Sequence, residues 1–186
     1  LGALKAAFGR KDRPESALCP FDPTRNGLVM GKGAAVLVPE SGERAEARGA
    51  RLRAEIVGYD QPPKPFHQAG VKRDGREMCE AIDAALAEAA QVAGEVGLVN
   101  APGLGPKQND RPENGAVKGS LGDHARAVPQ SSIKLEIWHS LGAIGSMEVV
   151  ACVKAIDENT VPPTANHTTD DPECDLDHVV DVGREQ

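Results

Sequence analysis

Two titratable side chains, five residues apart, mark the stretch of this 186-residue sequence with the clearest chemical potential. Lys134 supplies a cation and His139 supplies an imidazole, and a run rich in glycine and alanine follows them. A cation and an imidazole at the start of a helix can hold an anionic or carbonyl group. The alternative is that Lys134 is a solvated loop lysine and His139 simply begins a helix. Spacing alone leaves both interpretations open.

Apolar segments that alternate with amphipathic ones must position these two groups, and this alternation favours an α/β fold. The patterns predict strands over residues 28–38, 53–59, 95–101 and 128–132, with a short strand over 179–182. They predict helices over residues 1–8, 41–49, 76–92, 110–118 and 140–157. Ser41 is the expected cap of the second helix, and Gly49 is its expected stop.

Three carboxylates accompany the predicted helices. Asp110 followed by Glu113 fits a reciprocal helix cap, which explains both residues without any catalysis. Glu148 lies in the 140–157 helix, and a carboxylate buried there needs a backbone or basic partner. The small residues of that helix let another backbone approach closely, so we expect it to be the most buried helix.

Composition narrows the classes of function. The formal charge is −7, and acids and bases are mixed without a basic stripe, which argues against nucleic-acid binding. No apolar run approaches the roughly 20 residues of a membrane span. The first residues are too short and too polar for a signal peptide, so we expect the cytoplasm or an organelle stroma or matrix. The cysteines form no C-x-x-C pair, so no zinc site is expected, and Cys79 and Cys152 are expected to be buried thiols.

Ordered motifs along nearly the whole chain then point to a family. They are P-F-D-P-T-R-N-G-L-V-M-G-K-G-A-A-V-L-V-P-E at 20–40, L-G-D-H-A at 121–125, S-S-I-K at 131–134, H-S-L-G-A-I-G-S-M-E at 139–148, V-P-P-T-A-N at 161–166 and D-P-E-C-D-L-D at 171–177. The set resembles the C-terminal half of the β-ketoacyl-(acyl carrier protein) synthases, which are condensing enzymes with the thiolase fold. The resemblance implies half of such a fold, a mixed sheet packed between helices. Residues 1–186 would then form one domain that is incomplete without a second half.

The resemblance implies decarboxylative Claisen condensation. In that reaction a cysteine thiolate takes an acyl group from a carrier-protein thioester, and two histidines stabilise the enolate formed from a malonyl thioester. Lys134 matches the active-site lysine of the family, and His139 matches the second histidine. Asp110, Glu113 and Glu148 match acidic residues that support the site. No cofactor and no metal is implied.

Several positions depart from the family pattern. Pro102 stands where the first histidine belongs, and proline offers neither a donor nor a titratable group. None of the four cysteines has the sequence context of the nucleophile. Trp138 replaces a usual glycine, and Lys32 replaces a glutamate. We therefore expect a ketosynthase-like protein of fatty-acid or polyketide synthesis that is not catalytic alone and serves as a structural or interaction subunit.

The alternative is one part of a split synthase, whose partner chain carries the nucleophilic cysteine. Either hypothesis implies another protein chain as partner, either the missing ketosynthase half or a larger complex. An acyl carrier protein is a further candidate partner.

Overall fold

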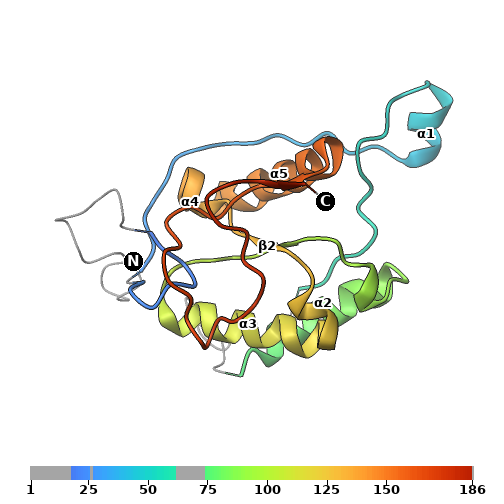
Figure 1. The fold of residues 1–186 in the computed structure, drawn as a ribbon. Helices are drawn as coiled ribbons and strands as arrows, with labels where there is room; N and C mark the ends of the chain where they lie inside the picture. The colour runs from blue at the N-terminus through green and yellow to red at the C-terminus, as the bar shows by residue number, and fades with distance from the viewer. Residues whose placement is uncertain (1–17, 26, 62–73, 186) are drawn as a thin grey trace.

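A computed structural model shows the fold and describes residues 18–25, 27–61 and 74–185 (Figure 1). Its helices are α1 (Gly42–Ala47), α2 (Arg76–Glu88), α3 (Lys107–Leu121), α4 (Lys134–Ile137) and α5 (Ile144–Glu158), and its 3-10 turns are η2 (Ala93–Glu95), η3 (Gly122–Arg126) and η4 (Leu141–Ala143). Its strands are β1 (Val99–Asn100), β2 (Gln130–Ser131), β3 (Thr160–Val161) and β4 (Arg184–Glu185). The helix predicted over residues 1–8 lies outside the described residues.

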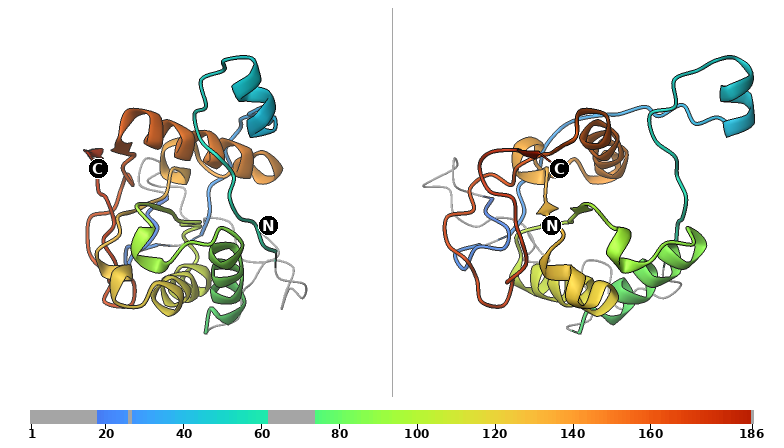
Figure 2. Two further views of the ribbon diagram at one scale, coloured as in Figure 1. Left: turned by 90° about the vertical axis from the view of Figure 1, so that its right-hand side faces the viewer. Right: turned by 45° about the vertical axis from the view of Figure 1, so that its right-hand side comes forward.

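The elements form layers around a short parallel strand pair. Helices α2 and α3 lie on one side of β2, and α4 and α5 lie on the other (Figures 1 and 2). β1 and β2 are parallel, with Val99 opposite Gln130, whereas β3 and β4 are antiparallel. The loops between β3 and β4 are called the last loops below. They extend the parallel pair, because Val179 N–H donates to the carbonyl of Gln130 at 2.8 Å. This arrangement fits the predicted α/β class.

The main apolar core lies between α2 and α3. Val117 and Leu121 of α3 are buried in it, and Ile82 and Leu86 of α2 pack against them from the other side. The amphipathic helix predicted over 76–92 is therefore confirmed, although it ends at Glu88. The predicted helix over 41–49 is also confirmed as α1, whose first turn is capped by the Ser41 hydroxyl, an acceptor for the backbone N–H of Arg44.

Two predicted strands are not strands. Residues 28–38 and 53–59 run as extended arms on either side of α1 (Figure 2), and most of their apolar side chains face solvent. Val36 is 87% exposed and Ile56 is 75% exposed. A strand needs a neighbour that accepts and donates backbone hydrogen bonds. Within the described residues no continuous strand pairs with either arm, and the parallel bridge between Met30 and His139 is isolated, so the β-forming sequence alone does not make a sheet there.

The remaining strand predictions are too long. The pairing expected over 95–101 and 128–132 shrinks to the two-residue strands β1 and β2. The strand expected over 179–182 is replaced by isolated bridges, in which His178 faces Gln130 and Val180 faces Thr164. Hydrogen bonds of the sheet type therefore form at single residues where the sequence pattern suggested continuous strands.

The prediction that the 140–157 helix is the most buried helix is wrong. Only Ile144 and Ala155 of α5 are buried, and Ile156 is 62% exposed. A Cβ atom added at Gly142 or Gly145 would meet no atom within 4 Å. The small residues give a flat face, but among the described residues nothing lies against it.

The thiols are also distributed differently from the prediction. Cys79 and Cys152 are half-buried, whereas Cys19 and Cys174 are buried, and all four are free thiols. Cys79 and Cys152 lie on the partly exposed helices α2 and α5. Among residues 18–25, 27–61 and 74–185, no helix is long and apolar enough to span a bilayer.

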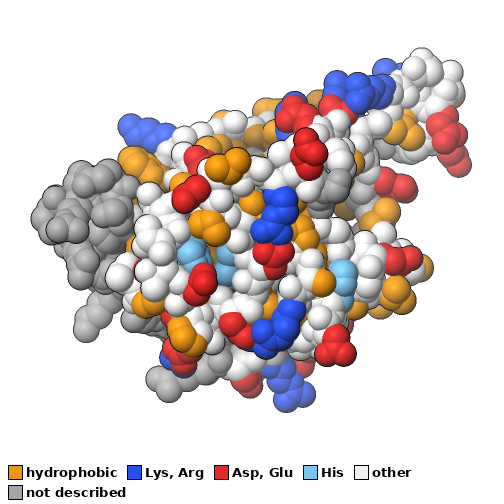
Figure 3. All heavy atoms as spheres, in the orientation of Figure 1, with side chains coloured by type: hydrophobic (Ala, Val, Ile, Leu, Met, Phe, Trp, Pro, Cys, Tyr) orange, Lys and Arg blue, Asp and Glu red, His pale blue; other side chains and the backbone are white. Residues whose placement is uncertain are grey.

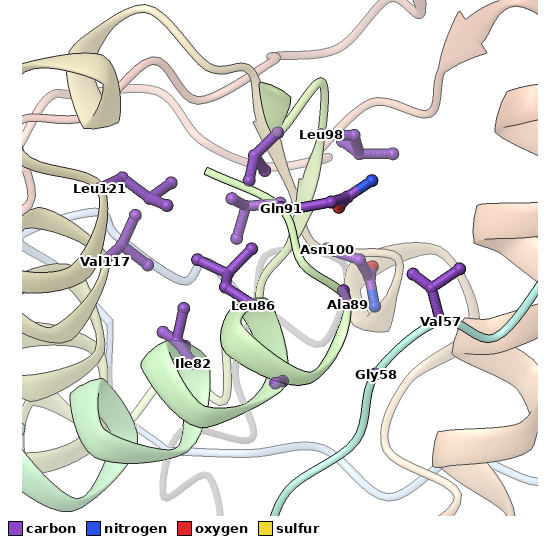
Figure 4. A pocket seen from close by; sticks show the side chains of 13 residues that line it. Val57, Gly58, Ile82, Leu86, Ala89, Gln91, Leu98, Asn100, Val117 and Leu121 are labelled. Carbon is purple, nitrogen blue, oxygen red and sulfur yellow. The ribbon is translucent and has the colours of Figure 1, made fainter. Parts of the chain in front are cut away.

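An apolar pocket opens between α2, α3 and the arm that carries Val57 (Figure 4). Ile82 and Leu86 line it from α2, and Val117 and Leu121 line it from α3. None of the chemically active residues singled out in the sequence lines this pocket. The candidate site therefore lies away from this pocket.

Candidate functional site

A tight loop, residues 101–106, follows β1 and enters α3. Gly103 has a φ of 47°, and a Cβ atom there would lie 2.4 Å from Ser132 Oγ. The Ser132 hydroxyl donates to the carbonyl of Pro102 at 3.4 Å. The loop is thus pressed against the segment that leads into α4, and only glycine fits at position 103.

Asp110 and Glu113 hold this loop from within α3. Asp110 accepts from the backbone N–H groups of Gly105 and Phe21, both at 3.1 Å. Glu113 accepts from Gly103 N–H, which lies 3.2 Å from Oε2. The predicted capping box is wrong, because α3 begins at Lys107 and both carboxylates already lie inside it. They satisfy the N–H groups of the loop and not those of the helix start.

Burial shifts the protonation equilibria of Asp110 and Glu113. Burial raises the pKa of Asp110 to about 6, and its hydrogen bond from Phe21 N–H and the nearby Arg25 charge oppose the rise. Burial, and next the charge of Asp110, raise the pKa of Glu113 well above its ordinary value. Like charges at close range cannot both ionise easily. The pair therefore binds a proton more readily than two isolated carboxyls would.

Arg25 balances the remaining negative charge. Its Nε lies 3.3 Å from Asp110 Oδ2, an ion pair without hydrogen-bond geometry. Its other end donates to Asp171 Oδ2 at 2.5 Å and to the carbonyl of Asp22 at 2.8 Å. The guanidinium is buried and joins the 18–25 loop, α3 and the acidic loop near the end of the chain. The sequence interpretation missed this residue, although it stands in the quoted P-F-D-P-T-R-N-G motif.

Asp22 ties the same loop to residues 168–169. Its Oδ2 accepts from the Thr168 hydroxyl at 3.0 Å and from the Thr169 N–H at 3.1 Å, while its Oδ1 accepts from Thr24. Burial acts to raise the pKa of Asp22, but the hydrogen bonds from Thr24 and Thr168 outweigh it and lower that pKa to about 2. Asp22 therefore stays ionised and fixes the loop that carries Arg25.

Lys134 and Glu148 form a buried ion pair between α4 and α5. Lys134 is the first residue of α4, and its ammonium contacts the Glu148 carboxylate directly. Only 4% of the Lys134 side chain is exposed. The interpretation of Lys134 as a solvated loop lysine is therefore wrong, and the basic partner expected for Glu148 is confirmed. A buried charge needs such a partner.

His139 is held in one tautomer. Its Nδ1 accepts from the backbone N–H of Leu141 at 3.0 Å, which leaves the proton on Nε2. Burial, and next the charge of Lys134, lower the pKa of His139, so the neutral ring is favoured. A neutral imidazole with Nε2–H can donate a hydrogen bond to a carbonyl or to a developing oxyanion.

The structure joins four of the predicted residues into one electrostatic cluster. The charges of Lys134 and Glu148 both act on the pKa of His139 and on that of Glu113. Asp110 joins this cluster through its charge, which raises the pKa of Glu113. The described residues hold no group of three His, Cys, Asp or Glu side chains suited to a metal ion. The arrangement can thus bind and polarise a carbonyl.

Comparison with known proteins places this geometry in a family. A model described as the β-ketoacyl synthase C-terminal domain matches residues 53–168, which is more than half of the chain. The chain belongs to the β-ketoacyl synthase family. The family predicted from the ordered motifs is therefore confirmed.

Two curated relatives of this β-ketoacyl synthase chain are named as polyketide synthase proteins. The granaticin polyketide β-ketoacyl synthase 1 of Streptomyces violaceoruber is 55% identical over 184 residues, which are 99% of this chain and 44% of the relative. The alpha subunit of the tetracenomycin ketoacyl synthase of Streptomyces glaucescens is 50% identical over 99% of this chain and 43% of the relative. The chain thus spans less than half the length of these relatives.

Solved structures agree with the fold. A ketosynthase in complex with its type II polyketide acyl-carrier protein and bound to a hexaketide has a TM-score of 0.94 at 37% identity, over 98% of this chain and 45% of that chain. A β-ketoacyl synthase of Burkholderia phymatum has a TM-score of 0.90 at 37% identity, over 98% and 44%. The predicted C-terminal half of a thiolase-like α/β fold is confirmed.

Proposed function

We propose that this polyketide-type ketosynthase chain binds a thioester at His139 but does not condense acyl groups alone, and that it acts as an interaction subunit. The observation that supports the proposal is the pairing of His139, an oriented donor, with Pro102, a residue that has no donor. Condensation by the family's route needs a thiolate and two donors for the developing oxyanion.

Three of the four cysteines support the proposal that this chain does not condense acyl groups alone. Burial raises the pKa of Cys174 to about 12, and burial also raises the pKa of Cys19 and Cys152. A thiolate is the reactive form, and a raised pKa keeps a cysteine as the inert thiol. These three cysteines are therefore poor acceptors of an acyl group at neutral pH.

The second candidate is a condensing synthase whose nucleophile is supplied by another polypeptide segment or chain. The intact Lys134–Glu148 pair and the fixed tautomer of His139 favour it, because a purely structural subunit does not require them. In this alternative, the half-site described here would stabilise the enolate while the cysteine elsewhere holds the growing acyl chain.

The first test uses the chain alone. We expect no label on protein thiols and no β-ketoacyl product when the purified chain meets labelled acyl and malonyl thioesters of a carrier protein. Slow release of carbon dioxide from the malonyl thioester is expected, because acid–base help of this kind is worth about 10²–10⁴-fold. His139→Ala should abolish it. His124→Ala is the matched control, since His124 Nε2 instead contacts the carbonyl of Val96 at 2.8 Å. Stable thiol labelling together with product would contradict the proposal.

The second test separates the two candidates. The chain is joined to the N-terminal portion of the granaticin relative, which supplies the part of the relative that this chain does not span, and condensation is measured with and without Pro102→His. Loss of one oxyanion donor typically costs about 10²–10³ in kcat. A rise of that size on Pro102→His supports the non-condensing proposal. Full activity of the unmodified fusion supports the second candidate.

We also propose a protein partner for the two arms. Val36, Val38, Ile56 and Tyr59 are each at least 70% exposed, and exposed apolar stretches of extended backbone invite association. Two structural neighbours carry names of multi-protein assemblies, a ketosynthase in complex with its acyl-carrier protein and the ishigamide ketosynthase/chain length factor. Sedimentation of the purified chain should show oligomers that decline in Val36→Lys/Val38→Lys. A monodisperse monomer at every concentration would contradict this.

We further propose that residues 1–186 act as one domain, to be checked by limited proteolysis.

A further inference from the structure

Two histidines of the last loops lie next to each other in the interior. His167 is 6% exposed and His178 is 8% exposed, and their ring centroids lie 5.7 Å apart with a tilt of 33°. Neither ring belongs to the candidate site around His139. A buried polar nitrogen normally has a hydrogen-bond partner, so the partners of each ring nitrogen decide what this pair can do.

One nitrogen of each ring is occupied. His167 Nε2 lies 3.1 Å from Asp170 Oδ1, and His178 Nε2 lies 3.1 Å from the carbonyl oxygen of Cys174. Carboxylate and carbonyl oxygens accept hydrogen bonds, so both Nε2 atoms carry the proton and donate it. A neutral ring in this tautomer has a bare lone pair on Nδ1.

The two Nδ1 atoms have no donor to accept from. Both are buried, and among the described residues neither has a hydrogen-bond partner. An unpaired buried acceptor is costly, and here two of them lie on neighbouring rings. The pair is therefore suited to a group that takes an electron pair from each ring.

The hydrogen bonds at Nε2 are those that accompany histidine ligands of metals. Such a histidine almost always donates its other ring N–H to a carboxylate or a backbone carbonyl, which fixes the tautomer and the orientation of the ring. His167 donates to a carboxylate, and His178 donates to a carbonyl. Phe21 also holds the plane of His178, because the two rings stack with centroids 4.1 Å apart.

The separation of the two imidazoles suits one shared ion. Bonds between a metal and imidazole are about 2 Å long, so two rings joined edge to edge through one ion have centroids about 6 Å apart. The observed 5.7 Å is close to that separation. It is too long for the face-to-face contact that Phe21 makes with His178 at 4.1 Å.

We propose that His167 and His178 form a two-ligand site for Cu(I), which binds through both Nδ1 atoms. In the part of the chain that the structure describes, no group of three His, Cys, Asp or Glu side chains is suited to a metal ion. Zn²⁺ normally takes four ligands, so this pair alone does not suit it. Copper binds imidazole well. Cu(I), with its filled d shell, is stable with two nitrogen ligands in a nearly linear arrangement.

The test is anaerobic titration of the purified chain with Cu(I), followed through the ¹⁵N chemical shifts of the histidine ring nitrogens. We expect one equivalent to shift the Nδ1 resonances of His167 and His178 and to leave those of His124 unchanged. Because thiols also bind Cu(I), the titration is repeated in Cys79→Ser/Cys152→Ser, which lacks the two half-buried thiols. X-ray absorption of the bound ion should show two imidazole nitrogens and no sulfur.

Substitutions test the same site through the second nitrogen of a ring. The Asp170 side chain is 99% exposed, so Asp170→Ala should fold like the wild type. Loss of such a supporting carboxylate typically lowers metal affinity about 10–100-fold. Asp123→Ala, which removes an exposed carboxylate of η3 instead, is the matched control and should leave the affinity unchanged. His178→Phe keeps a ring stacked on Phe21 and should abolish the binding of Cu(I) by nitrogen.

The outcomes separate a built site from adventitious copper. Nitrogen-only coordination with shifted resonances of both rings, weakened in Asp170→Ala and lost in His178→Phe, supports the proposal. Resonances of His167 and His178 that do not move in the wild type, or copper bound by sulfur alone, would overturn it without recourse to any variant. Equal Cu(I) affinities of the wild type and His178→Phe would overturn it as well.

Discussion

The buried loops around α3 and the exposed arms around α1 use side chains in opposite ways. Around α3, charged residues such as Asp110 and Arg25 are inside and paired. Along the arms, apolar residues such as Val36 and Ile56 are outside. Figure 3 shows one face of the molecule, on which apolar, acidic and basic side chains are interspersed. The difference teaches that the polar side chains of these motifs find their hydrogen-bond and ion-pair partners within this chain. A strand pattern, in contrast, needs a neighbouring strand.

The reason lies in the partners that each pattern requires. A carboxylate is satisfied by two or three donors, and loops that are distant in sequence can supply them, as Thr168 does for Asp22. A strand needs a continuous row of backbone partners. Among the described residues, that row is only two residues long in each strand, both in the β1–β2 pair and in the β3–β4 pair. The following predictions test this contrast, starting with the largest effect.

Arg25→Ala should have the largest effect on stability. It leaves Asp110 and Asp171 without their shared cation in a buried setting, and breaking a buried ion pair costs about 3–5 kcal/mol. The free energy of unfolding in urea measures the loss. Arg48→Ala is the matched control on the arm side, because its pair with Glu40 lies at the surface, and it should leave stability unchanged. Equal effects of the two changes would break the comparison.

Gly103→Leu should come next. Its positive φ and the contact of its Cβ with Ser132 combine strain with overpacking, for a loss of about 2–4 kcal/mol. Thermal and urea unfolding measure it. A variant as stable as the wild type would show that the 101–106 loop is looser than its contacts indicate.

Acid should weaken the packing of the last loops through His178. This ring stacks on Phe21 with centroids 4.1 Å apart, and its Nε2–H donates to the carbonyl of Cys174. Burial, and next the charge of His167, lower its pKa to about 4. The unfolded chain therefore binds the proton first, and this contribution to stability is lost as the pH falls from about 6.5 to about 4, by roughly 2–3 kcal/mol.

The raised pKa of Asp110 acts in the opposite direction over part of the same range. The folded state binds that proton more readily, so stability is gained as the pH falls through about 6. His178→Phe keeps the stacked ring and removes the imidazole, so the difference between wild type and variant isolates the histidine. A difference that stays constant between pH 7 and pH 4 would rule out this role of His178.

Gly145→Leu should have the smallest effect. A Cβ atom there meets nothing within 4 Å, and leucine is a better helix former than glycine by up to about 1 kcal/mol. We expect unchanged or slightly raised stability of the purified chain, measured by thermal unfolding. The same change should weaken the binding of any partner that packs on α5. A variant that is stable but no longer associates would therefore sharpen the comparison. A loss above 1 kcal/mol in the chain alone would contradict it.

Helices were predictable from the sequence because their hydrogen bonds are local. The cap at Ser41 and the apolar stripe of α2 carry their own evidence. The strands over 28–38 and 53–59 were not predictable, since the partner is the deciding factor and periodicity does not reveal it. The prediction that α5 is buried failed for the same reason. A face of small residues shows that another segment can approach closely, but not that one does.

The sequence predicted which residues form the candidate site better than it predicted what each residue does. The S-S-I-K and H-S-L-G-A motifs led to Lys134 and His139, and the structure joins both to Glu148. The start of α3 was misplaced by three residues, so Asp110 and Glu113 were assigned to a cap when they hold the 101–106 loop. Arg25 was missed, because its partners come from three separate segments.

The bond between Asp22 and Thr168 joins groups 146 residues apart, and this separation has a consequence for synthesis. A ribosome adds about 5–20 residues per second, so the 18–25 loop waits roughly 7–30 s for its partner to be made. During that interval the buried Phe21 has no cover from the last loops. The nascent chain therefore completes this corner of the fold only after residues 168–169 have been made, when a chaperone or another protein has had time to reach it first.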